Sequence, residues 1–85
     1  NGQTCIAPDY VLVHESIKDK LIDRLKEEVK ALFQEGDKPL EQSPHYARIV
    51  NEKHFARLSN MLRELVEKGA QLHLGGRVDA ADQFI

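Results

Sequence analysis

Two stretches in which apolar residues recur every three or four positions constrain the fold of this 85-residue chain most. This spacing places the apolar side chains on one face of a helix and the polar ones on the other. The first stretch predicts a helix over residues 17–33, with Ser16 as its N-cap residue and Asp19 completing a capping box. The second predicts a helix over residues 52–68 that is capped by Asn51 and is followed by Gly69. Each helix needs an apolar surface to lie on.

Two short apolar segments next to these stretches are typical of β-strands. Residues 10–14 are rich in β-branched and aromatic side chains, which predicts a buried strand. Residues 72–74 alternate apolar and polar side chains, and we expect Gly75 and Gly76 to turn the chain after them. The order strand, helix, loop, helix, strand predicts an α/β fold in which at least part of the sheet is parallel.

Length and composition narrow the classes of protein. A chain of 85 residues buries only about 60–65% of the surface that it exposes when unfolded, so its core is expected to be thin. A net charge of -2 with interspersed signs argues against a nucleic-acid partner. No apolar run approaches the roughly 20 residues that span a bilayer. The chain opens without methionine and closes on Phe84 and Ile85, so we expect it to be a piece of a larger domain.

Cys5 is the only cysteine and the best candidate for chemistry. It lies between Gly2 and Pro8, and a tight, glycine-led turn is an arrangement that can present a nucleophile. One helical turn before Pro8 would direct backbone N–H groups at a thiolate. From spacing alone, the favoured alternative is a small buried cysteine beside Ile6 and Ala7. A single cysteine forms no intramolecular disulfide, which fits a reducing compartment and predicts a cytoplasmic protein.

Other polar residues carry weaker signals. The spacing of the four histidines matches no zinc pattern, and they fall on separate predicted elements, so no metal site is expected. They are His14, His45, His54 and His73. Arg48 is expected to take part in a surface ion pair rather than to bind an anion.

The residues around Cys5 resemble those of a known family. Residues 1–10, Asn-Gly-Gln-Thr-Cys-Ile-Ala-Pro-Asp-Tyr, are similar to the catalytic-cysteine segment of the aldehyde dehydrogenase superfamily, and their second half resembles its class 3 branch of fatty, aromatic and coniferyl aldehyde dehydrogenases. Residues 43–51 resemble the same branch's Ser-Pro-Asp-Tyr-Gly-Arg-Ile-Ile-Asn stretch. His45 and Ala47 depart from the aspartate and glycine that are common there. Asn1 falls at a variable position and is assigned no role.

The resemblance implies an NAD- or NADP-dependent enzyme that oxidises an aldehyde to a carboxylic acid. Cys5 would be the nucleophile, and its main-chain amide would be one half of the oxyanion hole. Gly2 and Gln3 would shape the loop. Residues 1–85 would form part of a three-layer catalytic domain, with the cofactor-binding domain, the general base and the second oxyanion donor elsewhere, so the isolated chain is expected to be inactive.

Two further expectations stand beside this one. By analogy with the class 3 branch, the parent protein is expected to be a homodimer. The alternative function, from a different class, is a small non-enzymatic α/β interaction module that self-associates through its two amphipathic helices.

Overall fold

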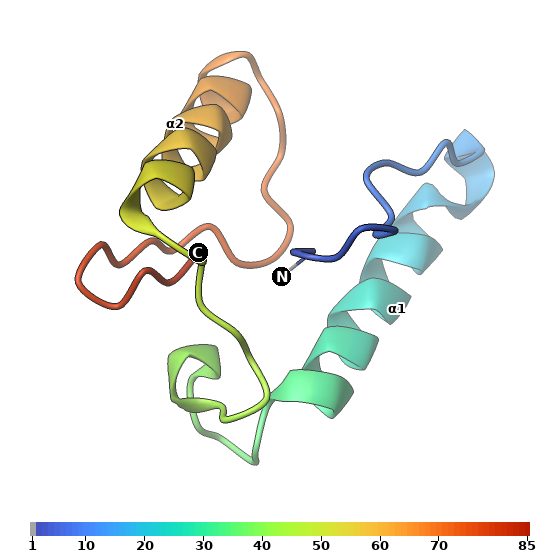
Figure 1. The fold of residues 1–85 in the computed structure, drawn as a ribbon. Helices are drawn as coiled ribbons and strands as arrows, with labels where there is room; N and C mark the ends of the chain where they lie inside the picture. Colours follow the sequence, from blue (N-terminus) through green and yellow to red (C-terminus); the bar gives the residue numbers. More distant parts are fainter. Residues whose placement is uncertain (1) are drawn as a thin grey trace. The chain divides into compact units, whose positions relative to one another are not determined.

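The computed structural model of the chain describes residues 2–85, which form two α-helices and one short 3₁₀ helix (Figure 1). In chain order these are α1 (Glu15–Phe33), η1 (Leu40–Gln42) and α2 (Glu52–Glu67). The two α-helices lie where the apolar periodicity predicts them, to within two residues at each end. The chain divides into two compact units, Gly2–Tyr46 and Ala47–Ile85.

The predicted α/β fold is wrong for the residues that the structure describes. Neither residues 10–14 nor residues 72–74 form a strand, and the one strand-like pairing in residues 2–85 is an isolated antiparallel bridge between Asp79 and Phe84. A strand exists only where a neighbouring strand accepts and donates its backbone hydrogen bonds. Neither apolar segment has such a neighbour among the described residues, so the apolar composition alone does not produce a sheet.

The helix α1 begins two residues earlier than its sequence predicts. His14 is the N-cap residue, with extended backbone angles and with its Nδ1 accepting a hydrogen bond from the Ser16 backbone N–H at 3.2 Å. Ser16 therefore lies inside the helix, and the capping box expected of Ser16 and Asp19 is not formed. An imidazole nitrogen satisfies the same unpaired N–H groups that a serine hydroxyl does.

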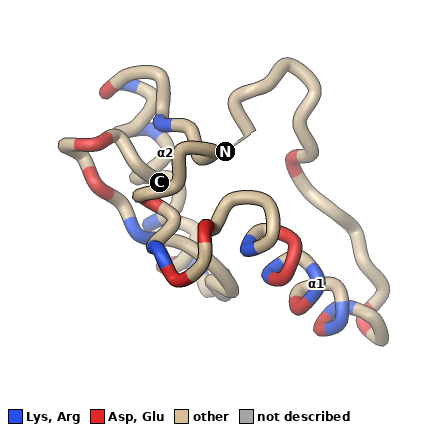
Figure 2. The backbone as a smooth tube through the Cα atoms, turned by 90° about the horizontal axis from the view of Figure 1, so that it is seen from below, with Lys and Arg blue, Asp and Glu red and all other residues tan. Residues whose placement is uncertain are grey.

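The apolar face of α1 has little cover within the Gly2–Tyr46 unit. No α1 residue is fully buried, and Ile17, Leu25 and Leu32 are each more than half exposed. Lysine, arginine and acidic residues alternate along the rest of the helix (Figure 2). At its end the Phe33 and Tyr46 rings lie nearly perpendicular, with 5.7 Å between the ring centroids and an interplanar angle of 89°. This edge-to-face contact ties the loop of residues 34–46 back to the helix.

The helix α2 has both of the ends that its sequence predicts. Asn51 is the N-cap residue, and its side-chain oxygen accepts a hydrogen bond from the His54 N–H at 2.9 Å. At the other end Gly69 has φ 93°, a left-handed conformation that favours glycine. Its N–H donates to the Val66 carbonyl, and the Ala70 N–H donates to the Leu65 carbonyl, which is the Schellman arrangement.

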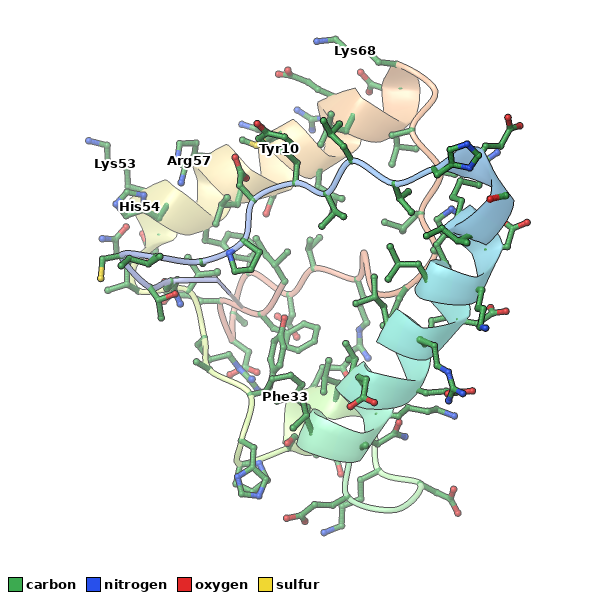
Figure 3. The ribbon with its side chains drawn as sticks, turned by 90° about the vertical axis from the view of Figure 1, so that its right-hand side faces the viewer. Tyr10, Phe33, Lys53, His54, Arg57 and Lys68 are labelled. Atoms are coloured by element: carbon green, nitrogen blue, oxygen red, sulfur yellow. The ribbon has the colours of Figure 1, made fainter. Side chains whose placement is uncertain are left out.

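Basic side chains extend away from the backbone at both ends of α2 (Figure 3). Lys53, His54 and Arg57 project outward from the first turns, and Lys68 projects from the C-terminal end (Figure 3). The Lys68 ammonium lies 4.0 Å from the Glu64 carboxylate, one turn earlier. Such exposed pairs contribute only about 0.3–0.5 kcal/mol each, so burial of apolar side chains matters more for this unit.

The small core of the Ala47–Ile85 unit lies where the chain before α2 meets the C-terminal residues. Ile49 is 3% exposed and Phe84 is 5% exposed, and they are the buried apolar side chains of the described residues. Between α2 and this core, Gly75 and Gly76 have φ 74° and 86°, so the predicted turn does depend on glycine. A Cβ atom on Gly76 would also collide with the Leu72 side chain.

Candidate functional site

The turn that presents Cys5 is built by the residues just before it. Gly2 has φ 77°, and its carbonyl accepts a hydrogen bond from the Thr4 N–H at 2.8 Å. Only glycine adopts such a backbone conformation without steric cost. The chain then turns through Cys5 and Ile6 before it runs irregularly to α1. The expected tight, glycine-led turn is present.

Cys5 is exposed and has a free thiol. The neighbouring Ile6 is 91% exposed, so no apolar pocket encloses this part of the chain. The alternative reading of Cys5 as a small buried hydrophobic residue is therefore wrong for the described structure. Exposure is what a nucleophilic thiol needs, because its substrate must reach the sulfur.

The backbone around Cys5 contributes less than the sequence suggested. Residues 2–7 form no helical turn, and the helix of this unit begins only at Glu15, so the expected helix N-terminus before Pro8 is not formed by the described residues. Among residues 2–85, none donates to or accepts from the Cys5 main-chain amide. That N–H is thus available to an incoming anionic oxygen.

The two histidines in the same unit as Cys5 have partners other than the thiol. His14 caps α1, and His45 lies 3.7 Å from the Glu35 carboxylate in the loop after α1. His54 lies in the first turn of α2, and His73 lies beyond its end. Across the described residues, no group of three or more histidine, cysteine and acidic side chains is placed to hold a metal ion.

Arg48 forms the ion pair that its sequence predicts, and its partner is Asp82. The Arg48 Nη2 atom lies 2.7 Å from Asp82 Oδ2, across 34 positions of sequence. Sequence reasoning gave no indication of this partner, because no local periodicity links residues so far apart. Only the fold of the Ala47–Ile85 unit brings them together.

The residues present do not form a dinucleotide site. A bound pyrophosphate needs a glycine-rich loop that leads into free N–H groups at a helix N-terminus. The first turn of α2 is capped by Asn51 and carries Glu52, and the first turn of α1 carries Glu15. Gly75 and Gly76 precede no helix in the described chain. The described residues therefore do not fit a nicotinamide cofactor.

Comparison with known sequences decides the family. Residues 1–85 match the profile of the aldehyde dehydrogenase family. The chain belongs to the aldehyde dehydrogenase family. The resemblance read from residues 1–10 and 43–51 is confirmed.

Individual relatives agree with the family and with its class 3 branch. This aldehyde dehydrogenase chain is 43% identical over 86 residues to 4,4'-diaponeurosporen-aldehyde dehydrogenase of Staphylococcus aureus, covering 99% of the chain and 17% of that protein. It is 39% identical over 84 residues to aldehyde dehydrogenase family 3 member A2 of Mus musculus, covering 99% of the chain and 16% of that protein. It is 36% identical over 85 residues to the dimeric NADP-preferring aldehyde dehydrogenase of Canis lupus familiaris, covering 100% of the chain and 17% of that protein.

The matches also show how much of an aldehyde dehydrogenase this chain corresponds to. It spans about a sixth of the length of these curated relatives. No solved structure matches it. Neither described α-helix is long and apolar enough to cross a membrane.

Proposed function

We propose that the protein is an NAD- or NADP-dependent aldehyde dehydrogenase that oxidises an aldehyde to a carboxylic acid. Membership of the family carries the proposal, since residues 1–85 match it throughout. The exposed Cys5 thiol in its glycine-led turn supports the assignment of Cys5 as the nucleophile. The name of the canine relative, which is NADP-preferring, supports a nicotinamide cofactor.

Cys5 has a defined part in this chemistry. Its thiolate Sγ forms a bond to the aldehyde carbonyl carbon, while the C=O π electron pair moves onto the oxygen. The Cys5 main-chain N–H, unpaired among the described residues, is available to donate to that oxyanion. When bound, NAD or NADP supplies the acceptor for the hydride that the adduct loses on becoming a thioester. Water then hydrolyses the thioester, which releases the acid and restores the thiol.

Three features of the whole protein belong to the same proposal. Residues 1–85 form part of the catalytic domain, and the cofactor is held by other residues, which accords with the poor fit of the described helix termini to a dinucleotide. The protein is a homodimer, which the name of the dimeric canine relative supports. A cytoplasmic location remains a prediction from the single cysteine.

A direct assay tests the function. The full-length protein is incubated with a series of aliphatic and aromatic aldehydes and with NAD⁺ or NADP⁺, and reduced nicotinamide and carboxylic acid are both measured. We expect the two products to form in equal amounts with at least one aldehyde. Absence of acid with every aldehyde, from protein that is folded and binds the cofactor, would contradict the proposal.

A further inference from the structure

Arg48 links the chain before α2 to the C-terminal residues in two ways. Its Nε and Nη2 atoms both lie 2.7 Å from Asp82 Oδ2. Its guanidinium carbon lies 5.1 Å from the centre of the Phe84 ring, within the range of a cation–π contact. The Arg48 side chain is 28% exposed and the Asp82 side chain is 52% exposed, so water screens the ion pair only in part. The Arg48 side chain therefore contacts both the Asp82 carboxylate and the Phe84 ring of the C-terminal segment.

Main-chain bonds join the same two segments. The Ile49 N–H donates to the Gln83 carbonyl at 3.0 Å. Asp79 and Phe84 exchange two backbone hydrogen bonds, of 2.9 and 3.0 Å, which close a tight turn between them. The Asp79 carboxylate accepts from the Ala81 N–H at 3.0 Å and stabilises that turn from inside. Since Ile49 and Phe84 are also buried, polar and apolar contacts coincide at this point.

We propose that Arg48, Asp82 and Phe84 form a conformational clasp that closes residues 50–78, including α2, into one loop. An isolated surface ion pair stabilises little, but here a charge-assisted hydrogen bond and a second ion contact join Arg48 to Asp82, and a ring contact joins Arg48 to Phe84. A main-chain hydrogen bond joins the adjacent residues Ile49 and Gln83. Loss of one contact therefore frees its neighbours. The clasp couples the C-terminal turn to the backbone that leads into the Asn51 cap of α2, so the two segments open together.

Hydrogen exchange of the full-length protein, followed by mass spectrometry of its peptides, tests the clasp. Arg48→Met should speed exchange about tenfold in residues 47–50 and equally in residues 79–85, because charge-assisted hydrogen bonds hold both. Asp82→Asn should speed exchange in both segments to a similar degree. The variant that carries both substitutions should exchange little faster than either single variant. Arg48→Lys should give exchange rates between those of the unaltered protein and of Arg48→Met, since lysine keeps the positive charge but lacks the several N–H donors of the guanidinium group.

The matched control is Arg63→Met. Arg63 bonds Asn60 at 2.9 Å within α2 and lies outside the clasp, so exchange in both segments should stay within twofold of the unaltered protein. The proposal is overturned if Arg48→Met and Asp82→Asn leave residues 79–85 unchanged, or if Arg63→Met speeds exchange as much as Arg48→Met. If Arg48→Met does not fold, the exchange rates of Asp82→Asn in the two segments are compared with those of the Arg63→Met control, and equal rates overturn the proposal.

Discussion

Replacing Cys5 by alanine in the full-length protein should lower kcat/KM for aldehyde oxidation by at least about 10³-fold, because the change removes the atom that bonds to the carbonyl carbon. Since Cys5 is exposed, alanine leaves no buried cavity and should not change the unfolding midpoint. Steady-state rates of the purified variant give kcat/KM, and thermal unfolding followed by circular dichroism gives the midpoint.

Thr4→Ser is the matched control for this experiment. It alters the neighbouring side chain, while the Thr4 N–H that bonds the Gly2 carbonyl is retained. We expect kcat/KM of the Thr4→Ser variant to remain within about threefold of the unaltered enzyme. Normal aldehyde oxidation by Cys5→Ala would mean that Cys5 is not the nucleophile, whatever the family of the chain.

Replacing Ile49 by alanine should cost about 2–4 kcal/mol of unfolding free energy, the usual penalty for truncating a buried isoleucine. Ile49 is 3% exposed, whereas the adjacent Val50 is 72% exposed. Val50→Ala should therefore change the unfolding free energy by no more than about 0.5 kcal/mol. Urea unfolding, followed by a probe of α-helix content, measures both variants.

The contrast between these neighbours makes the test sharp. Both are β-branched residues in the segment that leads into α2, so differences in strand or helix propensity are small. If Ile49→Ala and Val50→Ala lowered the free energy of unfolding equally, burial of the Ile49 side chain would not stabilise the unit. The core assigned to Ile49 and Phe84 would then be wrong.

Local sequence signals predicted the features that depend on local contacts. The period of the apolar residues located α1 and α2, and Asn51 and Gly69 marked the ends of α2 by the hydrogen bonds that such residues make. The glycine-led turn at Cys5 was likewise foreseen, since Gly2 takes the left-handed conformation that the turn requires.

Features that depend on distant partners were not predicted. The apolar run at residues 10–14 indicated a strand, but strand formation requires a neighbour that composition does not reveal. The cap of α1 fell to His14 because several polar side chains compete for the same N–H groups. The turn at residues 79–84 places Asp82 and Phe84 against Arg48, and no sequence pattern predicts this turn.

The central claim, that Cys5 carries the acyl group during aldehyde oxidation, is tested most directly by trapping that group. The full-length enzyme is mixed with aldehyde and cofactor, quenched in acid during turnover and digested, and the peptide that contains Cys5 is weighed by mass spectrometry. We predict a mass gain equal to the acyl group of the aldehyde, located on Cys5 and lost on treatment with hydroxylamine. An enzyme that forms acid while this peptide stays unmodified, or that carries the acyl group on another residue, would contradict the account.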